Sequence, residues 1–180
     1  MPLKTLLIAL LGLVSLAASA QAEDASPAAE SAFQVTFRYA GSDQVLDATV
    51  VPLLPGNACY NWYIRLAAGV SPKAVVERLT LPEPISTWGD AATNPDDGIE
   101  IEADGAVAVK TFVPAPDADG WFSDGWCVAE GDPTGAHKIE VSVDGTSLAT
   151  FDFEAVQPGD YAWPSIIQPD PLGRSVDNSW

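Results

Sequence analysis

Short segments in which apolar and polar residues alternate, separated by clusters of Pro, Gly, Asp and Asn, run from residue 32 to residue 156. Alternation with a period of two places successive side chains on opposite faces of a β-strand, so one face of each segment can be buried. Such segments at fairly even spacing are typical of an all-β sandwich or barrel. We predict strands near Ala32–Tyr39, Val45–Leu53, Ala58–Leu66, Ala74–Leu81, Gly98–Glu102, Val107–Val113, Trp121–Ala129, His137–Val143 and Leu148–Val156.

The dipeptide Asp144-Gly145 gives the sharpest local prediction. Apolar residues alternate with polar ones on both sides of it, before it at Ile139 and Val141 and after it at Phe151. A type I′ turn requires positive φ at both central residues, which Asp and Gly tolerate better than most residues. The last two segments therefore form a β-hairpin.

The segment from Ser71 to Leu79 fits two structures. Ser71 and Pro72 are suited to the start of a short helix. However, Val75 and Val76 are β-branched, and prolines follow soon after the segment. These residues favour a strand over the helix.

The first 22 residues have the three parts of a secretory signal peptide. Lys4 supplies a positive charge, the run Leu6–Leu16 is apolar, and small residues precede Ala22. The apolar run is shorter than the roughly 20 residues that span a bilayer. We expect cleavage after Ala22, with Ala20 as the alternative, and export to the periplasm or beyond.

The remaining chain has the length of one domain. We assign residues 1–22 to the signal peptide, 23–31 to a flexible linker, 32–156 to the sandwich domain, and 157–180 to an irregular tail rich in proline and aromatic residues.

Cys59 and Cys127 are the two cysteines of the chain. In an oxidising compartment such a pair forms a disulfide by default. A catalytic or metal-binding thiol pair is the alternative, but the pair lacks the CxxC spacing. Trp62 and Trp126 lie close to these cysteines in sequence, and we expect at least one of them to pack around the bridge.

The chain is strongly acidic, with a formal net charge of −17. Loss of Lys4 with the signal peptide leaves 7 basic and 25 acidic side chains, a charge of −18. Such a charge repels nucleic acid and anionic membranes. It suits cationic partners or Ca²⁺, or serves only to keep an exported protein soluble.

Two turns carry carboxylates beside a glycine, which is a pattern that can hold calcium. The candidate ligands are Asp96 and Asp97 in one turn and Asp117 and Asp119 in the other. Neither turn completes a twelve-residue EF-hand loop, and Asp-Gly is ordinary turn chemistry. We therefore expect no cofactor and keep these four residues as weak calcium candidates.

The residues for catalysis are sparse. His137 is the single histidine, and we expect it to be a half-exposed strand residue rather than a general base. A nucleophilic serine or cysteine needs such a base, and no GxSxG motif is present. Glu100 and Glu102 share a strand face and are the remaining carboxylate pair that a glycosidase could use. We expect no enzyme.

Aromatic residues in or beside turns are candidates for ligand binding. They are Trp88, Trp121, Tyr161 and Trp163. Exposed coplanar indoles stack on sugar rings in carbohydrate-binding modules, whereas packing in the core or against the tail is the alternative for each residue.

The segment from Gly131 to Val141, continued through Asp144-Gly145 to Glu154, resembles the closing two strands of immunoglobulin-like modules in exported bacterial proteins of unassigned function. The resemblance is mainly over residues 131–156. It implies an Ig-like β-sandwich of about 7–9 antiparallel strands and carries over no functional residues.

Taken together, these features predict a non-catalytic periplasmic or secreted binding or accessory protein. It would use a face or an edge of the sandwich to hold a protein or glycan partner, with no nucleic-acid binding and no membrane insertion. One alternative is a carbohydrate-binding module that uses exposed tryptophans. Another is an acidic inhibitor of a basic enzyme such as lysozyme, since opposite charges strengthen association at low salt.

Overall fold

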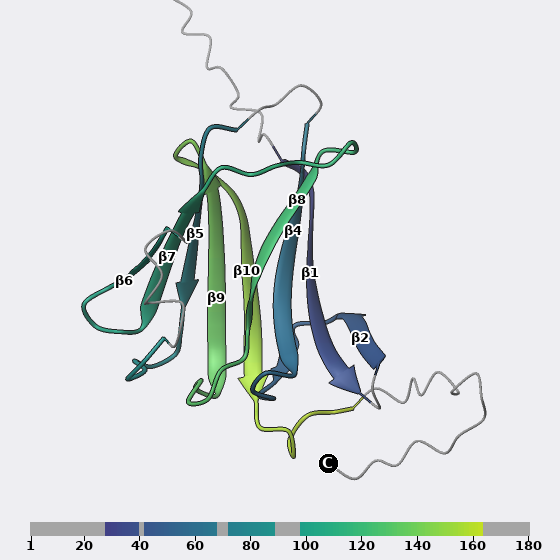
Figure 1. Cartoon of the computed structure of the whole chain (residues 1–180), viewed down its shortest axis with the longest axis vertical. Coiled ribbons are helices and arrows are strands. Elements are labelled where there is room, and N and C mark those ends of the chain that lie inside the picture. The colour runs from purple at the N-terminus through teal and green to yellow at the C-terminus, as the bar shows by residue number, and fades with distance from the viewer. Residues whose placement is uncertain (1–27, 40–41, 68–71, 89–97, 164–180) are drawn as a thin grey trace, which may run out of the picture.

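A computed structural model describes residues 28–39, 42–67, 72–88 and 98–163 (Figure 1). Every regular element in these residues is a strand. In chain order they are β1 (Ala28–Tyr39), β2 (Ser42–Asp47), β3 (Val50–Pro52), β4 (Ala58–Leu66), β5 (Val75–Thr80), β6 (Ile99–Ile101), β7 (Val107–Phe112), β8 (Trp121–Cys127), β9 (Gly135–Val143) and β10 (Thr146–Val156). The described residues contain no helix with the length and hydropathy that a membrane span requires.

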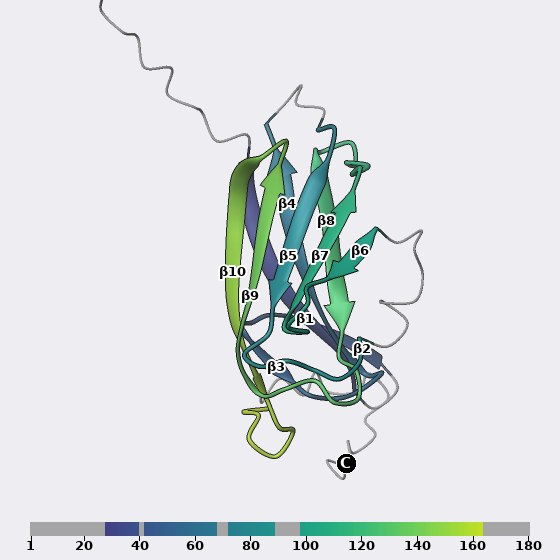
Figure 2. The same cartoon turned by 90° about the vertical axis from the view of Figure 1, so that its left-hand side faces the viewer.

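The strands form two sheets, which confirms the predicted all-β sandwich. The four-stranded sheet has the order β2-β1-β4-β8, and the six-stranded sheet has the order β3-β10-β9-β5-β7-β6. In Figure 2 the strands from β10 to β6 lie in front, with the four-stranded sheet behind them. Neighbouring strands are antiparallel, except that β3 pairs with β10 in parallel.

The predicted strand Val45–Leu53 is in fact two short strands in different sheets. The chain leaves the four-stranded sheet after Asp47 and joins the six-stranded sheet at Val50. The sequence pattern does not reveal this crossing. Apolar residues of both strands, such as Leu46 and Val51, face the same core, so the pattern of apolar and polar residues runs on from one strand to the next. The count therefore rises to ten strands within the described residues.

Alternation places the core between the sheets. On β4 the residues Ala58, Tyr60, Trp62, Ile64 and Leu66 are buried, and the residues between them are half-buried. The same pattern on β9 and β10 buries Ile139 and Phe153 against them. These side chains belong to one hydrophobic cluster that spans both sheets.

Two local predictions are confirmed. The hairpin between β9 and β10 turns at Asp144 and Gly145, whose φ angles are 48° and 85°. Both lie in the left-handed region that a type I′ turn requires. The segment from Val75 to Thr80 is a strand and not a helix.

The start of the domain differs from the prediction. β1 begins at Ala28, so residues 28–31 are part of a strand and not of a linker, because they continue the pairing with β4. In the tail, Tyr161 is buried against the domain. The signal peptide 1–22, residues 23–27 and residues 164–180 lie outside the described residues.

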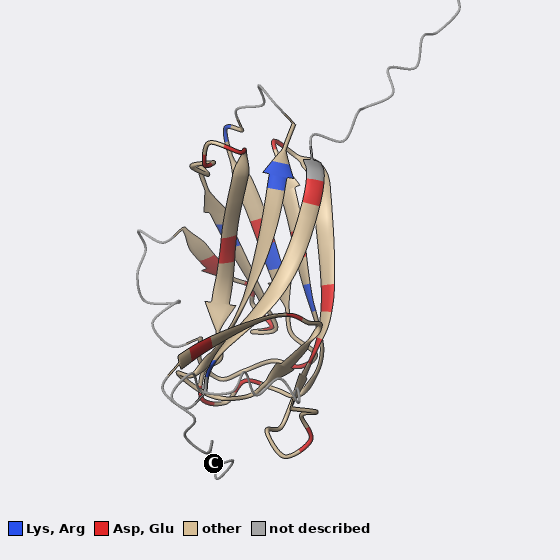
Figure 3. Ribbon diagram, turned by 90° about the vertical axis from the view of Figure 1, so that its right-hand side faces the viewer, with Lys and Arg blue, Asp and Glu red and all other residues tan. Residues whose placement is uncertain are grey.

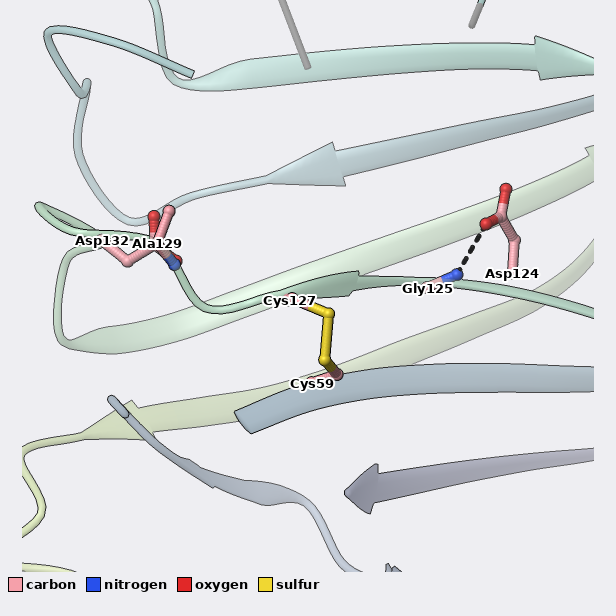
Figure 4. Close-up of a disulfide and its surroundings, with 6 residues drawn as sticks. All are labelled: Cys59, Asp124, Gly125, Cys127, Ala129 and Asp132. Carbon is pink, nitrogen blue, oxygen red and sulfur yellow. Dashed lines mark hydrogen bonds between the residues drawn. A yellow bond between two sulfur atoms is a disulfide. The ribbon is translucent and has the colours of Figure 1, made fainter. Parts of the chain in front are cut away.

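The predicted disulfide between Cys59 and Cys127 is present, but it does not join the two sheets. The cysteines face each other on the neighbouring strands β4 and β8, with 3.8 Å between their Cα atoms. They lie on the outer face of the four-stranded sheet, because Ala58 and Tyr60, which flank Cys59 on β4, point inward. Figure 4 shows the bridge between the two ribbons.

The expected packing of Trp62 or Trp126 around the bridge is wrong. Trp62 is three residues from Cys59, and Trp126 is adjacent to Cys127. An odd separation along a strand places two side chains on opposite faces. Both indoles therefore point to the interior of the sandwich, where they serve a different group.

Candidate functional site

Strand β8 forms one edge of the four-stranded sheet, and within the described part of the chain it pairs only with β4. The connection from β7 crosses from the other sheet to reach it, and a groove lies between this connection and β8. Its lining includes Tyr63, Phe112, Val113, Trp121, Ser123 and Asp124. The groove thus joins aromatic, aliphatic and charged groups at an open edge of the sandwich.

One apolar side chain of the groove is unusually exposed. Val113 is 72% exposed, and Val45 on β2, at the opposite edge of the same sheet, is 55% exposed. They are the large hydrophobic residues that the described part of the chain leaves exposed. Of the two, Val113 lines the groove.

The register of β8 directs backbone groups toward the open edge. In antiparallel pairs, closely spaced partners have N–H and C=O groups that point away from each other. Cys59 and Cys127 form such a close pair. Ser123, which lies opposite Tyr63, is four residues before Cys127, and this even separation makes it a pair of the same kind. The backbone N–H and C=O of Ser123 therefore point away from β4.

The residues on either side of Ser123 use part of their edge groups internally. Trp121 N–H donates to Asp117 Oδ1 at 2.9 Å, and Trp121 C=O accepts from Asp117 N–H at 2.8 Å. Gly125 N–H donates to Asp124 Oδ1 at 2.8 Å (Figure 4). Ser123 is thus the position at which an extended chain can add to this edge.

An ion pair ties the edge to the other sheet. Lys110 Nζ on β7 lies 2.6 Å from Asp124 Oδ2 on β8, and their side chains are 23% and 19% exposed. Both residues line the groove. Separating the partners of a largely desolvated pair is costly, because each charge would then be unpaired. The ion pair therefore helps to hold β8 against β7.

Beneath this ion pair lies a buried carboxylate. Glu77 faces inward from β5, opposite Lys110 of β7, and is 0% exposed. Trp62 Nε1 donates to Glu77 Oε2 at 2.7 Å, and Trp126 Nε1 donates to Glu77 Oε1. Glu77 belongs to the six-stranded sheet, and each of its carboxylate oxygens thus accepts an indole N–H from the four-stranded sheet.

Burial governs the acidity of Glu77. Desolvation raises the pKa of Glu77 to about 7, and the nearby charge of Asp124 also raises it. The indole hydrogen bonds and Lys110 act in the opposite direction, because they stabilise the charged form. Near neutral pH the group therefore exchanges between its charged and neutral forms inside the sandwich.

Trp88 covers this cluster from the side. Its ring meets that of Trp126 edge to face, with 5.9 Å between the centroids. Its Nε1 donates to the carbonyl oxygen of Gly105 at 3.1 Å. Trp88 is half-buried and so supports the position of Trp126 from outside.

The four predicted aromatic residues lie in three places. Trp88 packs on Trp126. The guanidinium carbon of Arg65 lies over Trp121, 5.5 Å from the centroid of the indole ring. Tyr161 and Trp163 contact each other, with centroids 4.7 Å apart, and both pack on Phe37. Of the four, Trp121 lines the groove.

The calcium candidates are only partly described. Asp117 Oδ1 accepts hydrogen bonds from Asp119 N–H and Trp121 N–H, both at 2.9 Å, which is the ordinary role of aspartate in a turn. Among the described residues no three acidic, His or Cys side chains gather at one point. Asp96 and Asp97 lie outside them, and calcium binding stays a prediction.

His137 is buried rather than half-exposed, which corrects the sequence-based expectation. It is 4% exposed, its ring stacks on Phe153 at 5.1 Å, and its Nδ1 donates to the carbonyl oxygen of Gly135 at 2.9 Å. Burial lowers its pKa. Glu102 pairs with Arg78 on the outer surface, and Glu100 is exposed.

Sequence reasoning missed Glu77, although the signal was present. Glu77 has the same parity as Val75 and Leu79 on β5, so it occupies a position of the buried face. A charged residue at such a position needs hydrogen-bond partners. The tryptophans that supply them come from strands distant in sequence, and no spacing rule identifies them.

No curated protein matches. An immunoglobulin-like protein (PA1606) from Pseudomonas aeruginosa matches with a TM-score of 0.44 and 15% identity over 71% of this chain and 98% of that chain. The alkylpurine DNA glycosylase AlkC of Pseudomonas fluorescens matches with a TM-score of 0.30 and 15% identity, over 59% of this chain and 27% of that chain.

The family comparison covers most of the chain. The family described as the PM0630 beta sandwich domain matches residues 31–156. This range contains β2 to β10 and β1 from Ser31 onward, together with the groove, Glu77 and both cysteines. The chain belongs to the PM0630 beta sandwich domain family.

Proposed function

We propose that this protein is a non-catalytic binding module of an exported protein, and that it holds an extended segment of a partner protein in the groove beside β8. The observation that carries the proposal is the edge itself. Ser123 directs a backbone donor and acceptor outward, and the exposed Val113 lies in the same groove. An added strand uses such groups for affinity and neighbouring pockets for specificity.

The charge of the chain indicates the chemistry of the partner. Five of the six basic residues that the structure describes lie in ion pairs: Arg38–Asp43, Arg65–Glu30, Arg78–Glu102, Lys110–Asp124 and Lys138–Glu140. Figure 3 shows further acidic residues on several strands and loops. Their excess attracts a segment with net positive charge, so we expect a basic partner.

The proposal of a non-catalytic role rests on how the titratable groups are used. Glu77 has a shifted pKa, which often marks a catalytic acid. Here, however, the group is 0% exposed and each oxygen accepts an indole N–H. Glu77 thus joins the two sheets. Export is supported by the signal-like first 22 residues and by the disulfide, which persists in oxidising compartments.

Two valine substitutions test the groove. The mature chain, with Val113→Asp or with Val45→Asp, serves as bait for proteins of the cell envelope. Both valines are exposed, so neither change disturbs the core. We expect Val113→Asp to lose a partner that the unchanged chain and Val45→Asp both retain. Equal retention by all three baits would reject the groove as the binding site.

A carbohydrate-binding role is the second candidate, because Trp121 and Tyr63 both line the groove. An array of envelope glycans separates the two functions. Glycan binding that is lost in Trp121→Ala and unchanged by salt would favour the carbohydrate role. Binding of basic peptides, or of a basic enzyme such as lysozyme, that weakens steeply as salt rises would favour a protein partner.

A further inference from the structure

The disulfide lies at the surface of the sandwich, beside one edge of the four-stranded sheet. Cys127 is exposed and Cys59 is half-buried. β8 is an edge strand, so among the described residues no strand lies beside Cys127 on the side away from β4. Its neighbour on the same face, two residues earlier, is Gly125 (Figure 4), and the side chain of Asn61 on β4 lies over that glycine.

The bond also joins strands that are already joined in other ways. β4 and β8 pair continuously from Cys59–Cys127 to Arg65–Trp121. On the inner face, Trp126 binds Glu77 and Asp124 binds Lys110, both of which belong to the other sheet. Breaking the disulfide therefore removes no contact of the hydrophobic core.

We propose that the Cys59–Cys127 disulfide is a site of thiol–disulfide exchange in the folded protein, and that a dithiol reductant opens it by attack on Cys127. This inference is independent of the partner in the groove. It assigns the bridge a chemical role on the outer surface of β8, in addition to its effect on stability.

The reaction balances as a two-electron exchange. A thiolate of the dithiol attacks Cys127 Sγ, the bond to Cys59 Sγ breaks, and Cys59 leaves as a thiolate that takes up a proton. The second thiol then attacks the reductant's own sulfur in the mixed disulfide and releases Cys127. The protein gains two thiols, and the dithiol becomes a disulfide.

The edge position selects the sulfur that is attacked. A thiolate approaches in line with the bond that breaks, from the side opposite to the leaving sulfur. For Cys127 this side is the edge of the four-stranded sheet, because β8 is the last strand in the order β2-β1-β4-β8. For Cys59 it lies over β1, where Thr36 is the paired residue. We therefore expect the mixed disulfide to form on Cys127.

Reduction kinetics test the proposal. The oxidised mature chain is treated with dithiothreitol in native buffer and in 6 M guanidinium chloride, and free thiols are counted over time. We expect the native rate to lie within about a hundredfold of the unfolded rate. Reduction through global unfolding would be slower by the folding equilibrium constant, about a thousandfold or more. A slowing beyond a hundredfold would overturn the proposal.

Two further measurements decide the remaining points. A native chain treated with the monothiol glutathione, quenched by alkylation and mapped by mass spectrometry should carry the adduct on Cys127, and an adduct mainly on Cys59 would contradict the assigned attack. Far-UV circular dichroism of the reduced protein, and of Cys59→Ser/Cys127→Ser, should keep the β-sheet spectrum. An unfolded reduced chain would show that the bridge is a structural staple only.

Discussion

At Glu77 the alternation of β5 conflicts with the cost of burying a charge. The position belongs to the inner face, between Val75 and Leu79, where an unpaired carboxylate would be strongly unfavourable. Trp62 and Trp126 resolve the conflict by donating one indole N–H to each oxygen. The residue therefore links the sheets, and its proton affinity is coupled to folding.

This coupling predicts a pH dependence of stability. The pKa of Glu77 is about 7 in the folded protein against an ordinary value of 4.5. Between these values the folded state binds more protons than the unfolded state, so the free energy of unfolding falls as pH rises. The shift corresponds to a loss of about 3 kcal/mol in the free energy of unfolding across this window. Above about pH 8 Glu77 causes no further loss.

The variant Glu77→Gln isolates that contribution from the other carboxylates. The free energy of unfolding of both proteins is measured in urea at pH 5 and at pH 8. From pH 5 to pH 8 it should fall by about 3 kcal/mol more in the wild type than in the variant. Glutamine does not titrate, so it lacks this term. Parallel pH profiles of the two proteins would show that Glu77 has an ordinary pKa.

The indole hydrogen bonds give a second prediction at this scale. Trp126→Phe keeps an aromatic side chain, although a smaller one, and removes the donor to Glu77. We expect the lost hydrogen bond to cost about 1.5–3 kcal/mol at pH 8, where its acceptor is charged. The loss should be smaller at pH 5. Trp88→Phe is the control, because its indole donates to the neutral carbonyl of Gly105, so its cost should not change with pH.

At the scale of single residues, the sequence predicts side chains whose partners are set by alternation and not those whose partners come from distant strands. The disulfide was predictable because two cysteines have one way to pair. Its place on the outer face also follows from alternation, because Cys59 has the opposite parity to the buried residues Tyr60 and Trp62. The Glu77 cluster was not predictable, because it needs the relative position of two sheets.

At the scale of elements, the β9–β10 hairpin shows how a local signal can specify structure. Asp144 and Gly145 both adopt positive φ, as the turn type requires. By contrast, the break between β2 and β3 has no strong turn signal, because Ala48 and Thr49 are compatible with an extended chain. This crossing between sheets is set by packing against β10 and not by turn chemistry.

Substitution of the turn glycine tests this account. Gly145→Ala meets no atom within 4 Å, so its cost arises from φ alone. We expect a loss of about 1 kcal/mol in the free energy of unfolding. Gly159→Ala is the matched control, since it also has open space but no positive φ. Equal stabilities of the two variants in urea unfolding would contradict the role given to the turn.

At the scale of the whole molecule, the disulfide and the core act on different states. The core stabilises the folded chain, whereas a bridge across 68 residues restricts the unfolded chain. We expect Cys59→Ser/Cys127→Ser to lower the free energy of unfolding by about 4 kcal/mol in denaturant titration. A loss below about 1 kcal/mol would contradict this division of roles.

The architecture as a whole directs the search for a partner to one edge, where the groove, the open backbone of Ser123 and the exposed Val113 meet. Amide hydrogen exchange on the domain alone and in complex with the captured partner measures this directly. We predict new protection at Ser123 of β8, whose N–H points to the open edge, with β2 unchanged. Protection confined to β2 or to residues 161–163, with β8 unchanged, would contradict the proposed binding site.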